Sequence, residues 1–157
     1  MSTLYVMVGI PGSGKSTWAK AHLTDAEYIS RDNVRLSIIK DNEDLFSHED
    51  EVYDKFVAIL ADGLRNQHNM VADATHMSHG ARKKLINAIA KNGVKSEEYE
   101  IVFVYMNTPI EECIRRDDLR EGRAHVTAPV IRRMARSLSC PAADEFPNIK
   151  EVIQVRE

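Results

Sequence analysis

A nine-residue segment, Gly9 to Thr17, constrains this chain more strongly than any other part of its sequence. It reads Gly-Ile-Pro-Gly-Ser-Gly-Lys-Ser-Thr and matches the pattern G-x-x-x-x-G-K-[ST] at every fixed position. The apolar run Leu4–Val8 precedes it as a buried strand would, and residues 18–23 suit a helix. Glycines at such a junction let backbone N–H groups and the helix N-terminus face one point, which favours an anion. The segment therefore predicts a phosphate cradle, and an accidental glycine-rich turn is the alternative.

The natural occupant of such a cradle is a triphosphate with its metal ion, Mg²⁺. Lys15 can reach the β- and γ-phosphates, and the Ser16 hydroxyl can ligate the Mg²⁺ that bridges them. The residues of the segment that we expect at the nucleotide are Gly12, Ser13, Gly14, Lys15, Ser16 and Thr17.

Strands alternate with helices along the whole sequence. Strands are predicted at residues 4–8, 27–30, 70–72, 99–106 and 151–155. Helices are predicted after the cradle, at 34–39, at 51–64, from Thr75 or Ser78 to Asn92, from Pro109 and from Pro129, with a loop at 41–50. This order predicts the α/β class and a P-loop NTPase fold of about five parallel strands, with helices on both faces. No linker or repeat interrupts the order, so residues 1–157 are expected to form a single domain built around the cradle.

Composition and charge set broad limits. The 157 residues are 43% hydrophobic and 29% charged, as in ordinary globular proteins. A formal net charge of −3 predicts no bulk attraction to nucleic acid but leaves room for a local basic groove. No apolar run approaches the roughly 20 residues that span a bilayer, and Cys113 and Cys140 lack metal-site spacing, so we expect reduced thiols. These features predict a cytoplasmic protein with no membrane contact and no obligate protein partner.

Two acidic residues stand where predicted strands end, at the edge of a parallel sheet where ligands bind. Asp32 follows the second strand and precedes Arg35 by one helical turn, so it is our candidate for the general base beside an attacking hydroxyl. A helix cap paired with Arg35 is the alternative for Asp32. Asp73 ends the third strand and is expected to hold a Mg²⁺-bound water or to position the acceptor, with a turn-forming aspartate as its alternative.

Arginines gather in the segment from residue 115 to residue 136. Arg116, Arg120 and Arg123 are spaced i, i+4 and i+7, so a continuous helix would present all three on one side. Guanidinium groups suit a phosphate chain, and Gly122 followed by a new helix indicates a movable lid. A solvated charged face, neutralised by nearby aspartates, is the alternative.

Other motifs narrow the choice of function. No N-K-x-D-type segment for reading a guanine base is present, and a small chain with an arginine lid favours phosphoryl transfer to a separate acceptor. His76 and His79 are three residues apart but lack a third metal ligand nearby, so we expect a surface or capping role for them.

At this level the sequence resembles the polynucleotide 5′-kinase domain of the bacteriophage T4 type and the related bacterial end-healing kinases. The resemblance covers nearly the whole chain, in the same order. It rests on Gly9–Trp18, Ser30–Arg35 with Ser37-Ile38, Val71–Asp73, the lid from Arg115 to Arg123, and the helix Val130–Met134.

The resemblance implies a kinase that moves the γ-phosphate of ATP to a 5′-OH end of DNA or RNA. Asp32 would be the general base, Arg35 would grip the phosphate on the 3′ side of the acceptor nucleoside, and Asp73 would be an acceptor-side acid. Arg116, Arg120 and Arg123 would be the lid arginines at the nucleotide, and Lys15 and Arg120 would join Asp32 in catalysis. A small-molecule kinase of the same fold, for a metabolite, nucleoside or antibiotic, and a non-enzymatic ATP-dependent binding module remain open alternatives.

Overall fold

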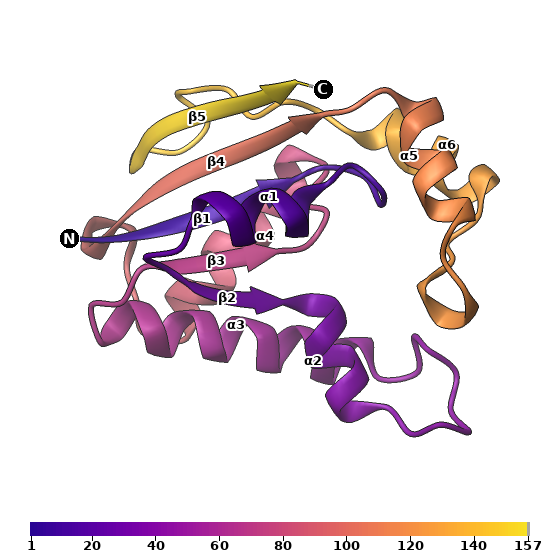
Figure 1. Ribbon diagram of the computed structural model, residues 1–157. Helices are drawn as coiled ribbons and strands as arrows, with labels where there is room; N and C mark the ends of the chain where they lie inside the picture. The colour runs from indigo at the N-terminus through magenta and orange to yellow at the C-terminus, as the bar shows by residue number, and fades with distance from the viewer. Residues whose placement is uncertain (157) are drawn as a thin grey trace.

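The computed structural model describes residues 1–156 and shows a five-stranded, wholly parallel sheet in the order β2-β3-β1-β4-β5 (Figure 1). The strands are β1 Ser2–Val8, β2 Glu27–Ser30, β3 Met70–Asp73, β4 Tyr99–Asn107 and β5 Ile149–Arg156. The helices are α1 Lys15–His22, α2 Arg31–Ile38, α3 Glu49–Arg65, α4 His79–Lys91, α5 Ile110–Asp118 and α6 Ala128–Ser137. Single 3₁₀ turns lie at Ser96–Glu98 and Gly122–Ala124. The predicted α/β architecture is confirmed.

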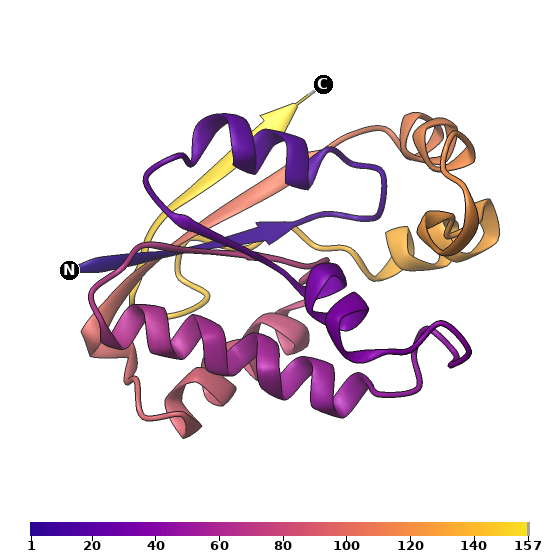
Figure 2. The ribbon, with the colours of Figure 1, turned by 60° about the horizontal axis from the view of Figure 1, so that its bottom comes forward.

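Helices cover both faces of the sheet, as predicted (Figure 2). On one face α1 packs through Ala19 against Met7 and Val104. On the other face α3 and α4 bury Phe56 and Ile89 in the larger core. Because side chains alternate along each strand, the central strands supply apolar groups to both faces.

The remaining helices lie beyond the carboxyl ends of the strands (Figure 1). There α5 and α6 form a small apolar cluster of their own, in which Cys113 and Ile131 pack with Ile10 of the cradle loop. The base of the predicted lid is therefore packed against the cradle itself. Cys113 is buried and Cys140 is exposed, and no disulfide joins them. Among residues 1–156, no helix is long and apolar enough to cross a bilayer.

Two element boundaries differ from the predicted ones for reasons visible in the structure. Helix α2 begins at Arg31 rather than Val34, because Ser30 Oγ accepts the Asn33 N–H at 3.2 Å and caps the helix at the end of β2. The loop predicted at residues 41–50 ends at His48, where α3 begins with three acidic residues in its first turn.

The predicted lid helix is shorter than the spacing of its arginines requires. Helix α5 ends at Asp118, so Arg120 lies in the turn that follows and Arg123 in a separate 3₁₀ turn. The buried carboxylate of Asp117 accepts the N–H groups of Val126 and Thr127, both at 2.8 Å, and folds the chain back at this point. The expectation that Arg116, Arg120 and Arg123 share one side of a helix is wrong.

Candidate active site

The segment from Gly9 to Thr17 forms a tight loop between β1 and α1. Gly12 and Gly14 have φ angles of 83° and 92°, which side chains disfavour. A Cβ at Gly12 would lie 2.4 Å from the carbonyl oxygen of Cys113, so the loop packs against α5 without room for a side chain. The hydroxyl of Ser13 is buried and has no hydrogen-bond partner within residues 1–156. A curled loop with an unsatisfied hydroxyl fits the predicted phosphate site.

Helix α1 starts from this loop without a capping side chain. Gly14 is the N-cap, and the N–H of Trp18 is the first in α1 to bond back to it, at 3.0 Å. Within residues 1–156 the N–H groups of Lys15, Ser16 and Thr17 have no backbone acceptor. These donors and the positive end of the helix dipole favour an anion at this point.

Lys15 lies at the centre of the predicted catalytic residues. Its Nζ donates to the carbonyl oxygen of Ile10 at 3.2 Å. Burial lowers the pKa of Lys15, the charges of Asp73 and Asp32 raise it, and Arg120 lowers it. The charges of Asp73, Asp32 and Arg120 thus all act on the cradle lysine.

Asp73 ends β3 beside the cradle and is buried. Its Oδ2 accepts the Ser16 hydroxyl at 2.5 Å and also the hydroxyl of Tyr28. Burial, followed by the bond to Asp73, raises the pKa of Tyr28 to about 12. A serine hydroxyl and a carboxylate in contact are the hard oxygen ligands that Mg²⁺ prefers. Ser16 and Asp73 therefore fit the expectation that Asp73 helps to hold Mg²⁺.

Asp32 does not cap its helix. Ser30 fills that role, and Asp32 follows in the first turn of α2 with its side chain 84% exposed. One oxygen of Asp32 accepts Nη1 of Arg35 at 2.5 Å. The capping half of the alternative is therefore wrong, whereas the ion pair with Arg35 that it also named is present. A catalytic role for the exposed carboxylate of Asp32 stays a prediction.

Arg35 is buried between two carboxylates rather than open to solvent. Besides its bond to Asp32, Arg35 donates from Nε and Nη2 to Glu49 at 2.8 and 2.7 Å. The hydrogen bond to Glu49 raises the pKa of Arg35, and the same bond lowers the pKa of Glu49. A guanidinium has five N–H donors, so a phosphate would share this group with the two acids. The predicted grip on an acceptor phosphate remains a prediction.

The first predicted lid arginine contacts the cradle, and the charge of the second acts on the cradle lysine. Arg116 donates from Nη1 to the carbonyl oxygen of Gly12 at 3.3 Å and from Nε to Glu112 at 3.0 Å. Arg120 is 40% exposed and lies 3.9 Å from the buried Asp117, and its positive charge lowers the pKa of Lys15. Both positions fit a role at the nucleotide phosphates.

Arg123 contacts the opposite side of the site. Its Nη2 donates to the carbonyl oxygens of Asp41 and Glu43, both at 2.9 Å. These belong to the segment between α2 and α3, residues 39–48, which we call the acceptor-side loop. The contact that Arg123 makes is thus a link between the lid and this loop, and its contact with the nucleotide stays a prediction.

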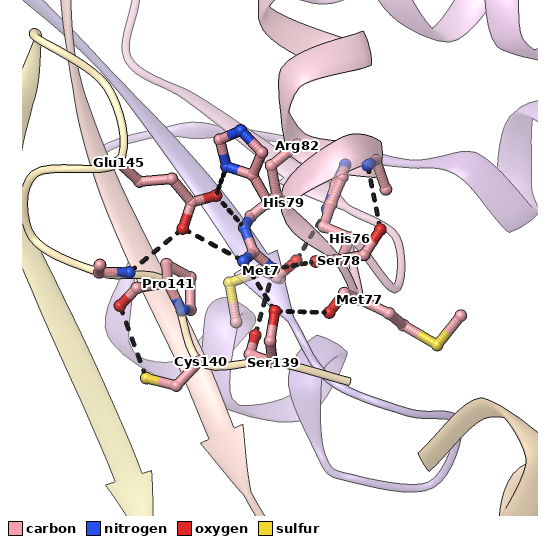
Figure 3. Close-up of polar contacts among 12 residues, drawn as sticks. Met7, His76, Met77, Ser78, His79, Arg82, Ser139, Cys140, Pro141 and Glu145 are labelled. Atoms are coloured by element: carbon pink, nitrogen blue, oxygen red, sulfur yellow. Dashed lines mark hydrogen bonds and ion pairs between the residues drawn. The ribbon is translucent and has the colours of Figure 1, made fainter. Parts of the chain in front are cut away.

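Behind the cradle, a buried arginine joins three segments (Figure 3). Arg82 of α4 is 1% exposed and donates to the two oxygens of Glu145 at 2.7 and 3.2 Å. It also donates to the backbone oxygens of His76 at 2.9 Å and Ser139 at 3.2 Å. A buried ion pair that loses one partner is strongly destabilising, so the Arg82–Glu145 pair should stay formed. Through its bond to His76, Arg82 then holds the loop that directly follows Asp73.

Only one of the two histidines has the predicted surface position. His76 is buried, and its Nδ1 is 2.8 Å from the carbonyl oxygen of Met7. Because a carbonyl can only accept, Nδ1 carries the proton, and burial lowers the pKa of His76 to about 4. The surface prediction is therefore wrong for His76. His79 does lie at the surface, where it contacts Glu145 at 3.0 Å.

Sequence reasoning missed two residues of the site, Tyr28 and Glu49. Tyr28 lies two positions before the end of β2 and reaches Asp73 across the parallel pair β2–β3. Its position on the same side of the strand as Ser30 was the available signal. Glu49 is separated from Arg35 by the acceptor-side loop, and no spacing rule in the sequence indicates their contact.

Comparison with known proteins agrees with this geometry. Residues 4–141 match the model of a family described as AAA domain, AAA_33. The chain belongs to this family. Its five-stranded sheet and cradle give this AAA domain the P-loop kinase fold.

Individual relatives of this AAA domain include kinases. L-seryl-tRNA(Sec) kinase of Methanococcus maripaludis is 24% identical over 153 residues, which are 93% of this chain and 57% of that protein. A chain of the Pnkp1/Rnl/Hen1 RNA repair complex is 26% identical with a TM-score of 0.73, over 87% of this chain and 44% of that chain. A sugar kinase from Janibacter sp. HTCC2649 shares the fold at 13% identity and a TM-score of 0.67, over 99% and 86%. This chain thus spans about half the length of the first two.

Proposed function

We propose that this chain is the kinase domain of an ATP-dependent polynucleotide 5′-hydroxyl kinase that phosphorylates 5′-OH ends of DNA or RNA in nucleic-acid end repair. Three findings support the proposal. The motifs from Gly9 to Asp73 and in the lid resemble those of such kinases. A chain of an RNA repair complex is 26% identical to this one. A second relative, L-seryl-tRNA(Sec) kinase, is by its name a kinase of an aminoacyl-tRNA.

The observation that carries the proposal is the placement of Asp32. Its carboxylate is 84% exposed, is not used to cap α2, and acts on the pKa of the cradle lysine. A phosphoryl transfer to a hydroxyl needs one carboxylate near the attacking oxygen and cations near the phosphates. A nucleotide-dependent binding module would need no such carboxylate, so Asp32 favours an enzyme over a switch.

The other residues divide the remaining work. The N–H groups of residues 14–17 would hold the phosphate chain of ATP, and Lys15 would neutralise charge on the transferred group. Ser16 and Asp73 would hold Mg²⁺, which supplies positive charge across the β- and γ-phosphates when bound. Asp32 would accept the proton of the attacking 5′-hydroxyl at a carboxylate oxygen. Arg116 and Arg120 would stabilise negative charge from the lid side.

One observation favours a second candidate, a kinase of a small molecule. The guanidinium of Arg35 is already bonded to Glu49 and Asp32 and is only 9% exposed. An acceptor with no phosphate of its own would leave these ion pairs intact. The acceptor, not the reaction type, therefore separates the two candidates.

The test is phosphate transfer from γ-labelled ATP to a panel of 5′-OH oligonucleotides, nucleosides and sugars. We expect label on oligonucleotide 5′ ends, and loss of that label in the D32N variant. Transfer only to sugars or nucleosides would replace the polynucleotide with a small-molecule acceptor. ATP binding with no transfer to any hydroxyl would support the binding module.

A further inference from the structure

Exposed large apolar side chains are concentrated at one end of the molecule. Within residues 1–156 they are Met1, Leu36, Phe46, Ile110 and Leu119. All except Met1 lie at the carboxyl end of the sheet, on α2, the acceptor-side loop, the start of α5 and the turn after it. Large apolar side chains exposed to water at a site indicate a binding surface, because covering them with a ligand lowers the free energy.

Phe46 is the one aromatic residue in this set, and it lies against the arginine that bonds the candidate base. Phe46 is 64% exposed, and the centroid of its ring lies 4.9 Å from Cζ of Arg35. The same guanidinium is bonded to Asp32. The guanidinium of Arg35 thus connects the proposed general base to an exposed aromatic ring.

The loop that carries Phe46 is held at both ends by residues of the site. Arg123 of the lid bonds the carbonyl oxygens of Asp41 and Glu43, and Arg35 bonds Glu49, the first residue of α3. These contacts hold the two ends of the loop, and the guanidinium of Arg35 holds the ring itself. A ring that is held in place and still exposed is suited to stacking.

We propose that Phe46 is the platform on which the 5′-terminal base of the acceptor stacks. The inference rests on the proposed function and names the part of the acceptor that this residue reads. The exposed ring makes a flat apolar surface, which matches the face of a nucleobase of any sequence. A polyol acceptor would instead need hydrogen-bond donors and acceptors at this place. Phe46 therefore determines specificity for a base-bearing acceptor and touches no reacting atom.

The experiment compares two 5′-OH oligonucleotides that differ only in their first nucleotide, one with its base and one abasic. KM for each is measured with wild-type protein, F46A and F46Y. In the wild type the abasic acceptor should have a KM about 5- to 150-fold higher, the range expected for one base stacked on an aromatic ring. F46A should raise KM for the normal acceptor by a similar factor, leave KM for the abasic one nearly unchanged, and change kcat little. F46Y should behave as the wild type.

Controls separate this role from a structural one. I110A removes another exposed apolar side chain at the same end of the molecule and should leave both KM values unchanged. Binding of the two acceptors without ATP, followed by fluorescence anisotropy of a 3′-labelled strand, should show the same pattern as KM.

The outcomes distinguish the platform from the proposed function. Equal KM values for the two acceptors in the wild type, or an equal loss on both in F46A, would overturn the platform while the kinase assignment stands. If the wild type transferred phosphate to neither oligonucleotide but did so to a sugar, the polynucleotide proposal and the platform would fail together.

Discussion

The cradle and the acceptor side of this site are built by different means. The cradle uses consecutive residues, Gly9 to Thr17, and most of its predicted contacts come from backbone N–H groups and a helix end. The acceptor side is assembled from side chains on α2, α3, the acceptor-side loop and the lid, joined by ion pairs such as Arg35–Glu49. A backbone site depends on local conformation, whereas a side-chain site depends on contacts between distant segments. The first should tolerate changes elsewhere, and the second should respond to them.

The largest effect is expected at the cradle. K15A should lower phosphate transfer by about 10³-fold, because the charge that develops on the transferred group loses its side-chain partner. The thermal midpoint should stay close to that of the wild type, since Lys15 faces the ligand site and not the core. The measurement is kcat with the best acceptor of the panel.

K83A, which removes an exposed lysine of α4, is the matched control. A K15A variant that kept both its turnover and its ATP affinity would contradict the assignment of the cradle.

D32N tests the acceptor side at the proposed base. Asparagine keeps the size of the side chain but cannot take up the proton, so transfer should fall by at least about 10²-fold. ATP affinity, measured by calorimetry, should be unchanged because the cradle is intact. D54N removes an exposed carboxylate of α3 and should retain full activity. Normal transfer by D32N would leave Asp32 with no role beyond its ion pair.

The two regions also differ in how well the sequence predicts them. The cradle was predictable because strand, glycines, lysine and helix are contiguous, and the structure keeps them together. Glu49 was not, because its contact with Arg35 depends on how the acceptor-side loop closes. The spacing of Arg116, Arg120 and Arg123 fits one side of a continuous helix, but Asp117 accepts the N–H groups of Val126 and Thr127, and α5 ends before Arg120. The alternation of strands and helices predicted a parallel sheet of about five strands, but not the order β2-β3-β1-β4-β5 of the strands in it.

A pH effect on stability is expected from His76, behind the cradle. Its pKa of about 4 in the folded state lies below the roughly 6.5 of an unfolded chain. Between these values only the unfolded state binds the proton, so the free energy of unfolding should fall as pH falls through that window. The slope should be at most about 1.4 kcal/mol per pH unit.

H76N should show a smaller slope than the wild type over the same window, measured by urea unfolding. Asparagine tolerates the positive φ of 43° at this position and keeps a donor for Met7. Identical slopes in the two proteins would mean that His76 is protonated in the folded state.

The smallest effects should come from the lid and should differ between its two arginines. R120A should raise KM for ATP or lower kcat, because the charge of Arg120 acts on Lys15, the residue expected at the phosphates. R123A should raise KM for the acceptor by about 2- to 10-fold, because Arg123 bonds the acceptor-side loop, and should weaken ATP binding less than R120A does. A matching loss of ATP affinity in both variants would instead place both arginines at the nucleotide.

The most direct test of the account compares a nucleoside with its 3′-monophosphate as acceptors, because the acceptor side is proposed to recognise a base-bearing end with an adjoining phosphate. Arg35 should favour the 3′-monophosphate by about 10- to 150-fold in kcat/KM, the range for a hydrogen bond to a charged group. R35A should remove most of this preference. Equal values for the two acceptors, or transfer to a sugar alone, would contradict the account and assign the site to a small-molecule kinase.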